Sequence, residues 1–233
     1  MKKILIILSF LSITVFSCKD YLQEEMVATI TQKYYDTPDG IEALVNGLYD
    51  GLKFHFNYEW AYSTTNYGTD EFTNGGGTNF IMWNTYSSTL DATNIHASAV
   101  WDNMYSNINL ANIGISKIPE VMENGDLANN RLGECYFMRA FDYFKLVKQF
   151  GGVPLKVRPS NGVELEFTRA SAEDIYKQII SDLKNAEALL PAEPAQVGRI
   201  AKYAAQHFLA KAYLFRASEL NASFSKPGDL GSA

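Results

Sequence analysis

The chain has 233 residues, of which 47% are hydrophobic, so it is long enough to bury a sizeable core within one domain. Its 26 acidic residues outnumber its 20 basic ones, and a net charge of −6 argues against nucleic-acid binding, which needs a concentrated positive face. The same balance favours uncharged ligands over anionic ones.

The first 17 residues have the pattern of an export signal. Two basic residues, Lys2-Lys3, precede an apolar run over residues 4–16, which is shorter than the roughly 20 residues that a membrane-spanning helix needs. Ser17 is the small residue before the cleavage point, and Cys18 follows it directly. This pattern predicts a lipoprotein signal with Cys18 as the lipidation site, although Phe16 stands where a small residue is usual. The alternative is simple secretion with a free thiol at Cys18.

Residues 18–36 are predicted to form an extended tether, followed by one helical domain over residues 37–220. In its first helix, Thr37 is the expected cap and Pro38 the first helical residue. Apolar residues then recur with a period of 3.6, at Ile41, Leu44, Val45, Leu48 and Leu52.

Residues 53–95 have few long apolar runs, three consecutive glycines and many aromatic, Asn and Thr residues. A loop of this length inside a compact domain is usually functional or disordered, and the aromatic content argues against disorder. We therefore predict a long aromatic and Asn-rich loop inserted between helices. It contains the candidate ligand-binding residues, which are Trp83, Asn84, Tyr86, Trp60, Tyr67 and Asp70.

Flat rings beside short amide or carboxylate groups suit sugars, which present an apolar C–H face and a rim of hydroxyls. Rigid aromatic side chains lose little entropy on binding, and amides both donate and accept hydrogen bonds. Trp83-Asn84 with Tyr86 is the first choice, and Trp60 and Tyr67 come next. The alternative is that the rings form the loop's own small core and that Asp70 only holds the loop.

Helical periodicity resumes near Ala97 and stops before Pro119, with Trp101 at a core position. In the next helix, residues 131–150, the apolar arc covers about half of the circumference, wider than the roughly 100° stripe of a helix with one packing partner. We therefore expect this helix to be clasped between neighbours.

The opposite side of the same helix gathers its charged residues, including Arg131, Glu134 and Asp142. Cys135 lies among the core positions and is predicted to be a buried, inert thiol.

Residues 156–168 are expected to be a connector, after which Ser171 and Asp174 begin a fourth helix as a capping box. A fifth helix uses small residues between Ala201 and Ala212. Long helices joined by short loops predict an all-α fold of irregular tetratricopeptide-like pairs.

The helix over residues 131–150 runs into Phe150-Gly151-Gly152-Val153-Pro154-Leu155, and this block resembles the signature of the SusD/RagB family of bacterial outer-membrane nutrient-binding lipoproteins. Thr168-Arg169-Ala170-Ser171, Leu189-Leu190-Pro191 and Gly198-Arg199 follow in the family's order. The resemblance covers roughly residues 18–220. Family members are about twice as long, so it implies a truncated chain in which residues 221–233 are a tail.

The resemblance implies a non-catalytic protein that binds oligosaccharides on the cell surface and delivers them to a TonB-dependent SusC-like outer-membrane transporter. It implies attachment to the outer membrane through the lipid anchor only, and a glycan site drawn partly from the loop at residues 53–95. It leaves open which glycan or peptide is bound.

Catalytic motifs of hydrolases, zinc proteases and nucleotide-binding enzymes are absent from the sequence, and we expect no cofactor. A calcium loop at Asp70 is rejected because Phe72 and Ile81 occupy ligand positions, so no metal is expected. Two alternatives remain: a helical-repeat scaffold that binds only protein, and a glycoside hydrolase using Asp70 or Glu71 with Glu59.

Overall fold

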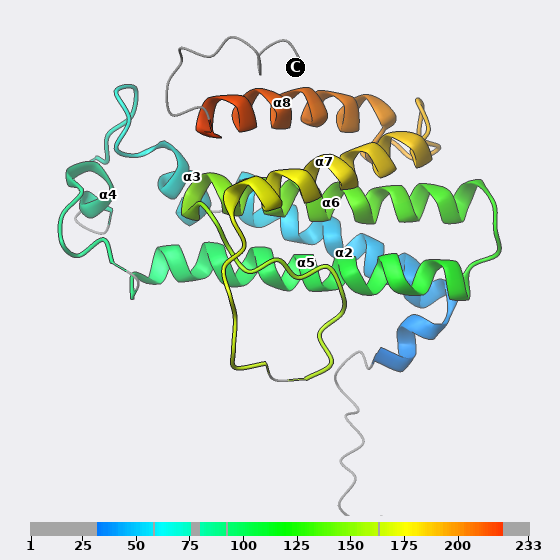
Figure 1. The fold of residues 1–233 in the computed structure, drawn as a ribbon. Helices are drawn as coiled ribbons and strands as arrows, with labels where there is room; N and C mark the ends of the chain where they lie inside the picture. The colour runs from blue at the N-terminus through cyan, green and yellow to red at the C-terminus, as the bar shows by residue number, and fades with distance from the viewer. Residues whose placement is uncertain (1–31, 58, 76–79, 92, 163, 221–233) are drawn as a thin grey trace, which may run out of the picture. The chain divides into compact units, whose positions relative to one another are not determined.

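The computed structural model describes residues 32–57, 59–75, 80–91, 93–162 and 164–220 (Figure 1). The predicted export signal, Cys18, the tether up to residue 31 and the tail at residues 221–233 lie outside these residues, as does the side chain of Trp60. Contacts divide the chain into two units, Met1–Tyr34 and Tyr35–Ala233, and the helices from residue 38 onward belong to the second.

The part of the chain that the structure describes is helical and contains no strand, which confirms the predicted all-α class. Seven α-helices and one short 3-10 helix are described: η2 (Gln32–Asp36), α2 (Pro38–Asn57), α3 (Glu59–Asn66), α4 (Ile81–Thr85), α5 (Ile95–Val121), α6 (Asp126–Phe150), α7 (Ala172–Leu189) and α8 (Lys202–Leu220). No described helix combines the length and the apolar character that crossing a membrane would require.

Helix α6 lies at the centre of the bundle, in contact with α2, α5, α7 and α8 (Figure 1). Its wide apolar arc is buried on several sides, as predicted, with Met138, Tyr143 and Leu146 fully enclosed. Helix α5 approaches α6 closely at Gly114, where an added Cβ would lie 2.5 Å from the sulfur of Cys135. Cys135 is a free and buried cysteine, as expected, and burial raises the pKa of its thiol.

The prediction of a single loop over residues 53–95 is wrong in its extent. Helix α2 continues to Asn57, and α3 and α4 are helical segments inside the predicted loop. Both are short, and α4 buries no residue, so neither has the apolar period that marks a helix in sequence. Among the described residues, the irregular part is therefore 67–75, 80, 86–91 and 93–94, with α4 between them.

The prediction that a helix stops before Pro119 is also wrong, because α5 runs to Val121 with Pro119 inside it. A proline costs most in a helix interior, where it removes a hydrogen bond and crowds the preceding turn. Here it lies in the last turn and is exposed, while the preceding Ile118 is buried. The backbone N–H of Met122 then bonds to Ile118 and closes the helix.

The charged side of α6 is buried, contrary to the expected separation of a polar face. Arg131, Glu134, Arg139 and Asp142 are all less than 10% exposed. Only the first turn of α6 and Lys148 near its end are exposed, so the four charged side chains must find partners inside the bundle.

Four side chains, Glu42, Arg131, Glu134 and Arg199, form a closed ring of ion pairs, called here the four-charge ring. Arg131 contacts Glu42 at 2.6 Å and Glu134 at 3.2 Å. Arg199 contacts Glu134 at 2.8 Å and Glu42 at 3.4 Å. The ring joins α2, α6 and the segment before α8, which are far apart in sequence.

Three of the predicted helix ends are confirmed, the starts of α2 and α7 and the end of α6. The hydroxyl of Thr37 accepts a hydrogen bond from the backbone N–H of Gly40, and Ser171 accepts one from Asp174. Gly151, with a φ of +68°, ends α6 with its N–H bonded to the carbonyl of Val147. Such a left-handed residue is readily supplied by glycine.

Candidate functional site

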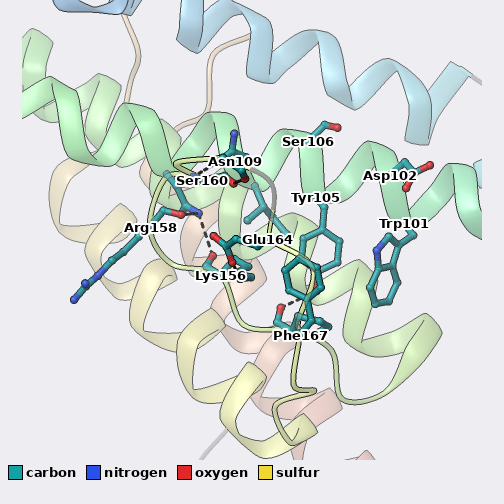
Figure 2. Close-up of a pocket in the computed structure, with 14 residues that line it drawn as sticks. Trp101, Asp102, Tyr105, Ser106, Asn109, Lys156, Arg158, Ser160, Glu164 and Phe167 are labelled. Carbon is teal, nitrogen blue, oxygen red and sulfur yellow. Dashed lines mark hydrogen bonds and ion pairs between the residues drawn. The ribbon is translucent and has the colours of Figure 1, made fainter. Parts of the chain in front are cut away.

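Two irregular segments carry the surface aromatic residues of interest. The first contains most of the predicted ligand residues and is called the loop cluster, defined as Tyr67, Gly68, Asn74, Trp83, Asn84 and Tyr86. The second is the connector between α6 and α7, residues 151–171, which lies along α5 and forms one wall of a cleft (Figure 2).

Gly68 is the centre of the loop cluster. Its backbone N–H donates to Oδ1 of Asn84 at 2.9 Å, and its carbonyl accepts from the Tyr86 hydroxyl at 2.7 Å. Gly68 has a φ of +79°, and an added Cβ would overlap the carbonyl oxygen of Trp83. Glycine is therefore required at this position by both backbone conformation and space.

The amide of Asn84 is used within the loop. Besides accepting from Gly68, it donates through Nδ2 to Asn74. Both polar atoms of Asn84 thus hold residues 68 and 74 near α4. In this conformation the amide supports the loop, and the ring of Tyr86 is the more accessible group.

Tyr86 presents its ring to solvent. It is 70% exposed and has a φ of +49°, which is uncommon for a residue other than glycine. Because its hydroxyl is bonded to Gly68, the ring is held in place with its surface exposed. A fixed, exposed ring of this kind is suited to stacking against an apolar ligand face.

The other predicted rings are less exposed. Tyr67 packs edge-on against Phe80 at 5.9 Å, and Phe80 packs against the buried His96 at 4.4 Å. Trp83 is half-buried, and its indole nitrogen has no hydrogen-bond partner among the described residues. Asp70 is exposed on the turn that follows Gly68.

The structure therefore brings together four of the predicted residues, Trp83, Asn84, Tyr86 and Tyr67, with Asp70 close to them in the chain. The side chain of Trp60 is outside the described residues, so its place relative to this group is not assigned.

A cleft of about 560 Å³ lies between α5 and the connector. Its aromatic lining is Trp101 and Tyr105 from α5 and Phe167 from the connector. The rings of Trp101 and Tyr105 are 4.9 Å apart and tilted by 42°. Trp101 was predicted to be core; the structure packs it partly against the core and leaves it half-buried at the cleft.

The connector backbone is held by side chains from the helices. Tyr105 donates to the carbonyl of Pro154 at 2.6 Å, and Asn112 donates to the carbonyls of Lys156 and Arg158 at 3.1 Å each. In the absence of a sheet or helix, these side chains satisfy backbone groups that would otherwise be unpaired.

The Tyr143 hydroxyl bonds to both backbone polar groups of one connector residue, Lys156. Its hydroxyl accepts from the N–H of Lys156 at 2.6 Å and donates to the carbonyl of the same residue at 2.8 Å. Burial raises the pKa of Tyr143 and of Tyr105, so both hydroxyls stay protonated and can donate.

Beneath the connector, Arg139 makes a two-pronged pair with the buried Asp182, at 2.8 and 2.7 Å. Arg139 also donates to Asn112 and to the carbonyl of Val157. Burial opposes the charge of Arg139, but its hydrogen bonds to Asp182 outweigh this and raise its pKa. The same buried pair thus positions Asn112 for its contacts with the connector.

Charges on the cleft wall balance. Lys156 and Arg158 are basic, and Asp102 and Glu164 are acidic. Lys156 forms an ion pair with Glu164, and its ammonium lies 4.4 Å from the centre of the Phe167 ring. Asn109 accepts from the backbone N–H of Ser160 at 2.8 Å. Among the described residues, no group of three or more His, Cys, Asp or Glu side chains could hold a metal ion.

Sequence reasoning missed this cleft because its residues come from a helix and a connector that each look ordinary alone. The available signal was the length of the stretch between α6 and α7, since long structureless connections in compact domains are often functional. A second signal was the presence of two large apolar residues, Leu165 and Phe167, in a stretch predicted to be a connector.

Comparison with known proteins places the chain among SusD-like proteins. Residues 20–214 match the model of a family described as starch-binding and associating with the outer membrane. SusD-like protein P2 of Formosa agariphila is 26% identical over 93% of this chain, and a SusD-like protein of Bacteroides ovatus is 26% identical over 99%. The chain spans 44% and 42% of those relatives, respectively.

Solved structures agree with these matches. A laminarin-binding SusD-like protein has a TM-score of 0.69 and 27% identity, covering 80% of this chain and 42% of its own. A structure with a xylogluco-oligosaccharide has a TM-score of 0.66 and 25% identity, covering 82% of this chain and 38% of its own. The helices described above therefore have the SusD-like fold.

Proposed function

The chain belongs to the SusD-like family, described as starch-binding and associating with the outer membrane, and on this premise we propose that it binds oligosaccharides at the cell surface. The family comprises non-catalytic binding proteins, so the glycoside hydrolase alternative is set aside. The bound sugar would be delivered to a TonB-dependent SusC-like transporter in the outer membrane.

The observation that carries the binding proposal is the fixed, exposed ring of Tyr86. Its hydroxyl is bonded to Gly68 and its ring is 70% exposed, in a family whose structural relatives include a laminarin binder. We propose that the ring stacks on a sugar and that Trp83 adds to the platform. Trp60, Tyr67, Asn84 and Asp70 are the further candidate contacts.

Attachment to the membrane is proposed through a lipid on Cys18, with residues 18–36 as the tether. Several acyl chains hold a protein firmly on a membrane, whereas one chain does so only marginally. A tethered protein beside a pore recaptures its ligand at a high effective concentration. This would favour delivery of the sugar without any catalytic step.

The helices of residues 37–220 are proposed to form irregular tetratricopeptide-like pairs. In support, α2 packs on α5, α5 on α6, α6 on α7 and α7 on α8, as in a chain of helical hairpins (Figure 1).

Isothermal titration calorimetry of the purified protein with starch, laminarin and xyloglucan oligosaccharides tests the binding proposal. We expect binding of at least one oligosaccharide, weakened about three- to tenfold by Tyr86→Ala, because a stacked ring contributes about 0.5–1.5 kcal/mol beyond its area. Tyr203→Ala is the matched control, since Tyr203 is also exposed, at 63%, but lies on α8.

Absence of binding to all three oligosaccharides would contradict the proposal. Equal effects of Tyr86→Ala and Tyr203→Ala would contradict the assignment of the loop cluster while leaving oligosaccharide binding in place.

A further inference from the structure

We propose that the cleft between α5 and the connector is a second saccharide-binding site, specific for neutral oligosaccharides and separate from the loop cluster. The inference rests on the proposed function only in that both sites take the same class of ligand.

Three rings line the cleft from two sides. Trp101 and Tyr105 are four residues apart on α5 and therefore lie on the same face of the helix. Figure 2 shows their rings extending from α5 toward the connector, with Phe167 beside Tyr105. Because the Tyr105 hydroxyl is bonded to Pro154, what Tyr105 offers a ligand is its ring. Rings on two sides can receive the apolar faces of a sugar.

Short polar groups lie beside the rings. Asp102, Ser106 and Asn109 come from α5 and line the same cleft. The Asn109 oxygen is used by Ser160, which leaves its NH₂ group to donate to a ligand. Together these groups supply a carboxylate acceptor, a hydroxyl and an amide donor. A sugar hydroxyl, which both donates and accepts, matches this mixture.

Charge balance selects an uncharged ligand. The lining has two basic residues, Lys156 and Arg158, and two acidic residues, Asp102 and Glu164, so it has no net charge. Lys156 already has Glu164 as its partner and covers the Phe167 ring. An anionic ligand would have to displace Glu164 to reach this ammonium. A neutral chain of sugars requires no such exchange.

The cleft is preformed. Its connector wall is fixed to α5 and α6 through Tyr105, Asn112 and Tyr143, so little ordering is needed when a ligand binds. Its volume of about 560 Å³ lies within the roughly 300–1,000 Å³ range of small-molecule sites. About half of the Phe167 side chain (53%) is exposed, so this apolar surface is available to a ligand.

Nuclear magnetic resonance of the purified protein can test the site through the indole N–H of Trp101, one of three tryptophans in the chain. Trp60→Phe and Trp83→Phe variants assign the Trp101 signal by elimination. On titration with laminarin-derived and xyloglucan-derived oligosaccharides, we expect a saturable shift of the Trp101 signal. Phe167→Ala should weaken the corresponding affinity about three- to tenfold.

Leu165→Ala is the matched control, because Leu165 is 88% exposed in the same connector and does not line the cleft. It should leave the Trp101 titration unchanged, and so should Tyr86→Ala, which alters only the loop cluster.

Each other outcome decides against the inference. Shifts at Trp83 without any at Trp101 would overturn the second site and leave the proposed function standing. A Trp101 shift with oligogalacturonate, an anionic probe, but not with neutral sugars would overturn the ligand class. A Trp101 shift only with an extended peptide would overturn the saccharide assignment and indicate that the cleft binds polypeptide. No response to any saccharide in either assay would remove both proposals.

Discussion

The loop cluster and the connector are both irregular and both carry exposed rings, yet they are held in different ways. The loop cluster is held by its own residues: Asn84 and Tyr86 bond to Gly68, which lies 16 and 18 residues earlier in the chain. The connector is held from outside, by Tyr105 and Asn112, whose partners lie 49 and 44 residues away.

This difference predicts how the structure of each segment responds to an amino-acid substitution. A loop that is closed by its own contacts can open while the helices stay folded. A connector whose carbonyls are bonded to buried side chains depends on the bundle, and a change in the bundle reaches it through Asn112 and Arg139. Substitutions in the bundle, the connector and the loop cluster should therefore differ in how far their effects spread.

Replacement of Arg139 should destabilise the bundle and release the connector together. Arg139→Met leaves Asp182 buried without its main partner, which costs about 3–5 kcal/mol in the free energy of unfolding. Urea denaturation measures this loss, and hydrogen exchange at Lys156 and Arg158 reports the connector. The double variant Arg139→Met with Asp182→Leu should recover most of the stability, because no unpaired charge is then buried.

The deficit of Arg139→Met should also depend on pH. Burial already raises the pKa of Asp182, and without Arg139 it rises further. A protein loses stability with rising pH wherever a carboxyl group has a higher pKa in the folded than in the unfolded state. The deficit of Arg139→Met relative to the wild type should therefore grow as the pH rises from the folded-state pKa of Asp182 in the wild type to its higher value in the variant. Lys177→Ala is the control: its ion pairs are exposed, and its loss should cost less than about 1 kcal/mol. A deficit independent of pH would contradict the role given to Asp182.

Tyr143→Phe should have an intermediate effect that is centred on the connector. It removes two hydrogen bonds to Lys156 and leaves the N–H of that residue unpaired, at a cost of about 1–3 kcal/mol. Tyr105→Phe removes only one bond, to the carbonyl of Pro154, and should cost about 1 kcal/mol. Urea denaturation of both variants gives the ranking, and an equal cost would mean that the double contact at Lys156 adds nothing.

Gly68→Ala should have the smallest effect on global unfolding, on the order of 1 kcal/mol or less, because the loop can open locally. Hydrogen exchange of residues 67–75 and 80–86 should nevertheless become faster, since the new Cβ overlaps Trp83 and a φ of +79° strains alanine. Gly75→Ala is the matched control, with no atom within 4 Å of its added Cβ. A global loss as large as that of Arg139→Met would show that the loop is part of the bundle's cooperative unit.

The helices could be predicted because their evidence is local. Ile41, Leu44 and Leu48 of α2 repeat with the helical period and are all buried. Thr37 and Ser171 mark helix starts through bonds to residues three positions later. Helices α3 and α4 were missed because they are short and lack this period.

The polar interior could not be predicted in the same way. Nothing near Arg139 in the sequence indicates that it will form a buried ion pair with Asp182, 43 residues away. Of the candidate site, the rings of the loop cluster were identified from composition alone, but the bond from Tyr86 to Gly68 depends on the folded loop. The cleft between Trp101 and Phe167 could not be predicted, because it forms only where the folded connector runs along α5.

The four-charge ring can be completed only late in synthesis of the chain. Glu42 leaves the ribosome first, Arg131 and Glu134 follow about ninety residues later, and Arg199 comes last, 157 residues after Glu42. Until Arg199 is added, Glu134 has only Arg131 within the ring to offset a carboxylate that is 2% exposed in the folded protein. A nascent chain that stops before residue 199 therefore has one arginine for two carboxylates in the ring, which disfavours burial of Glu134, so complete closure of the helices waits for the start of α8.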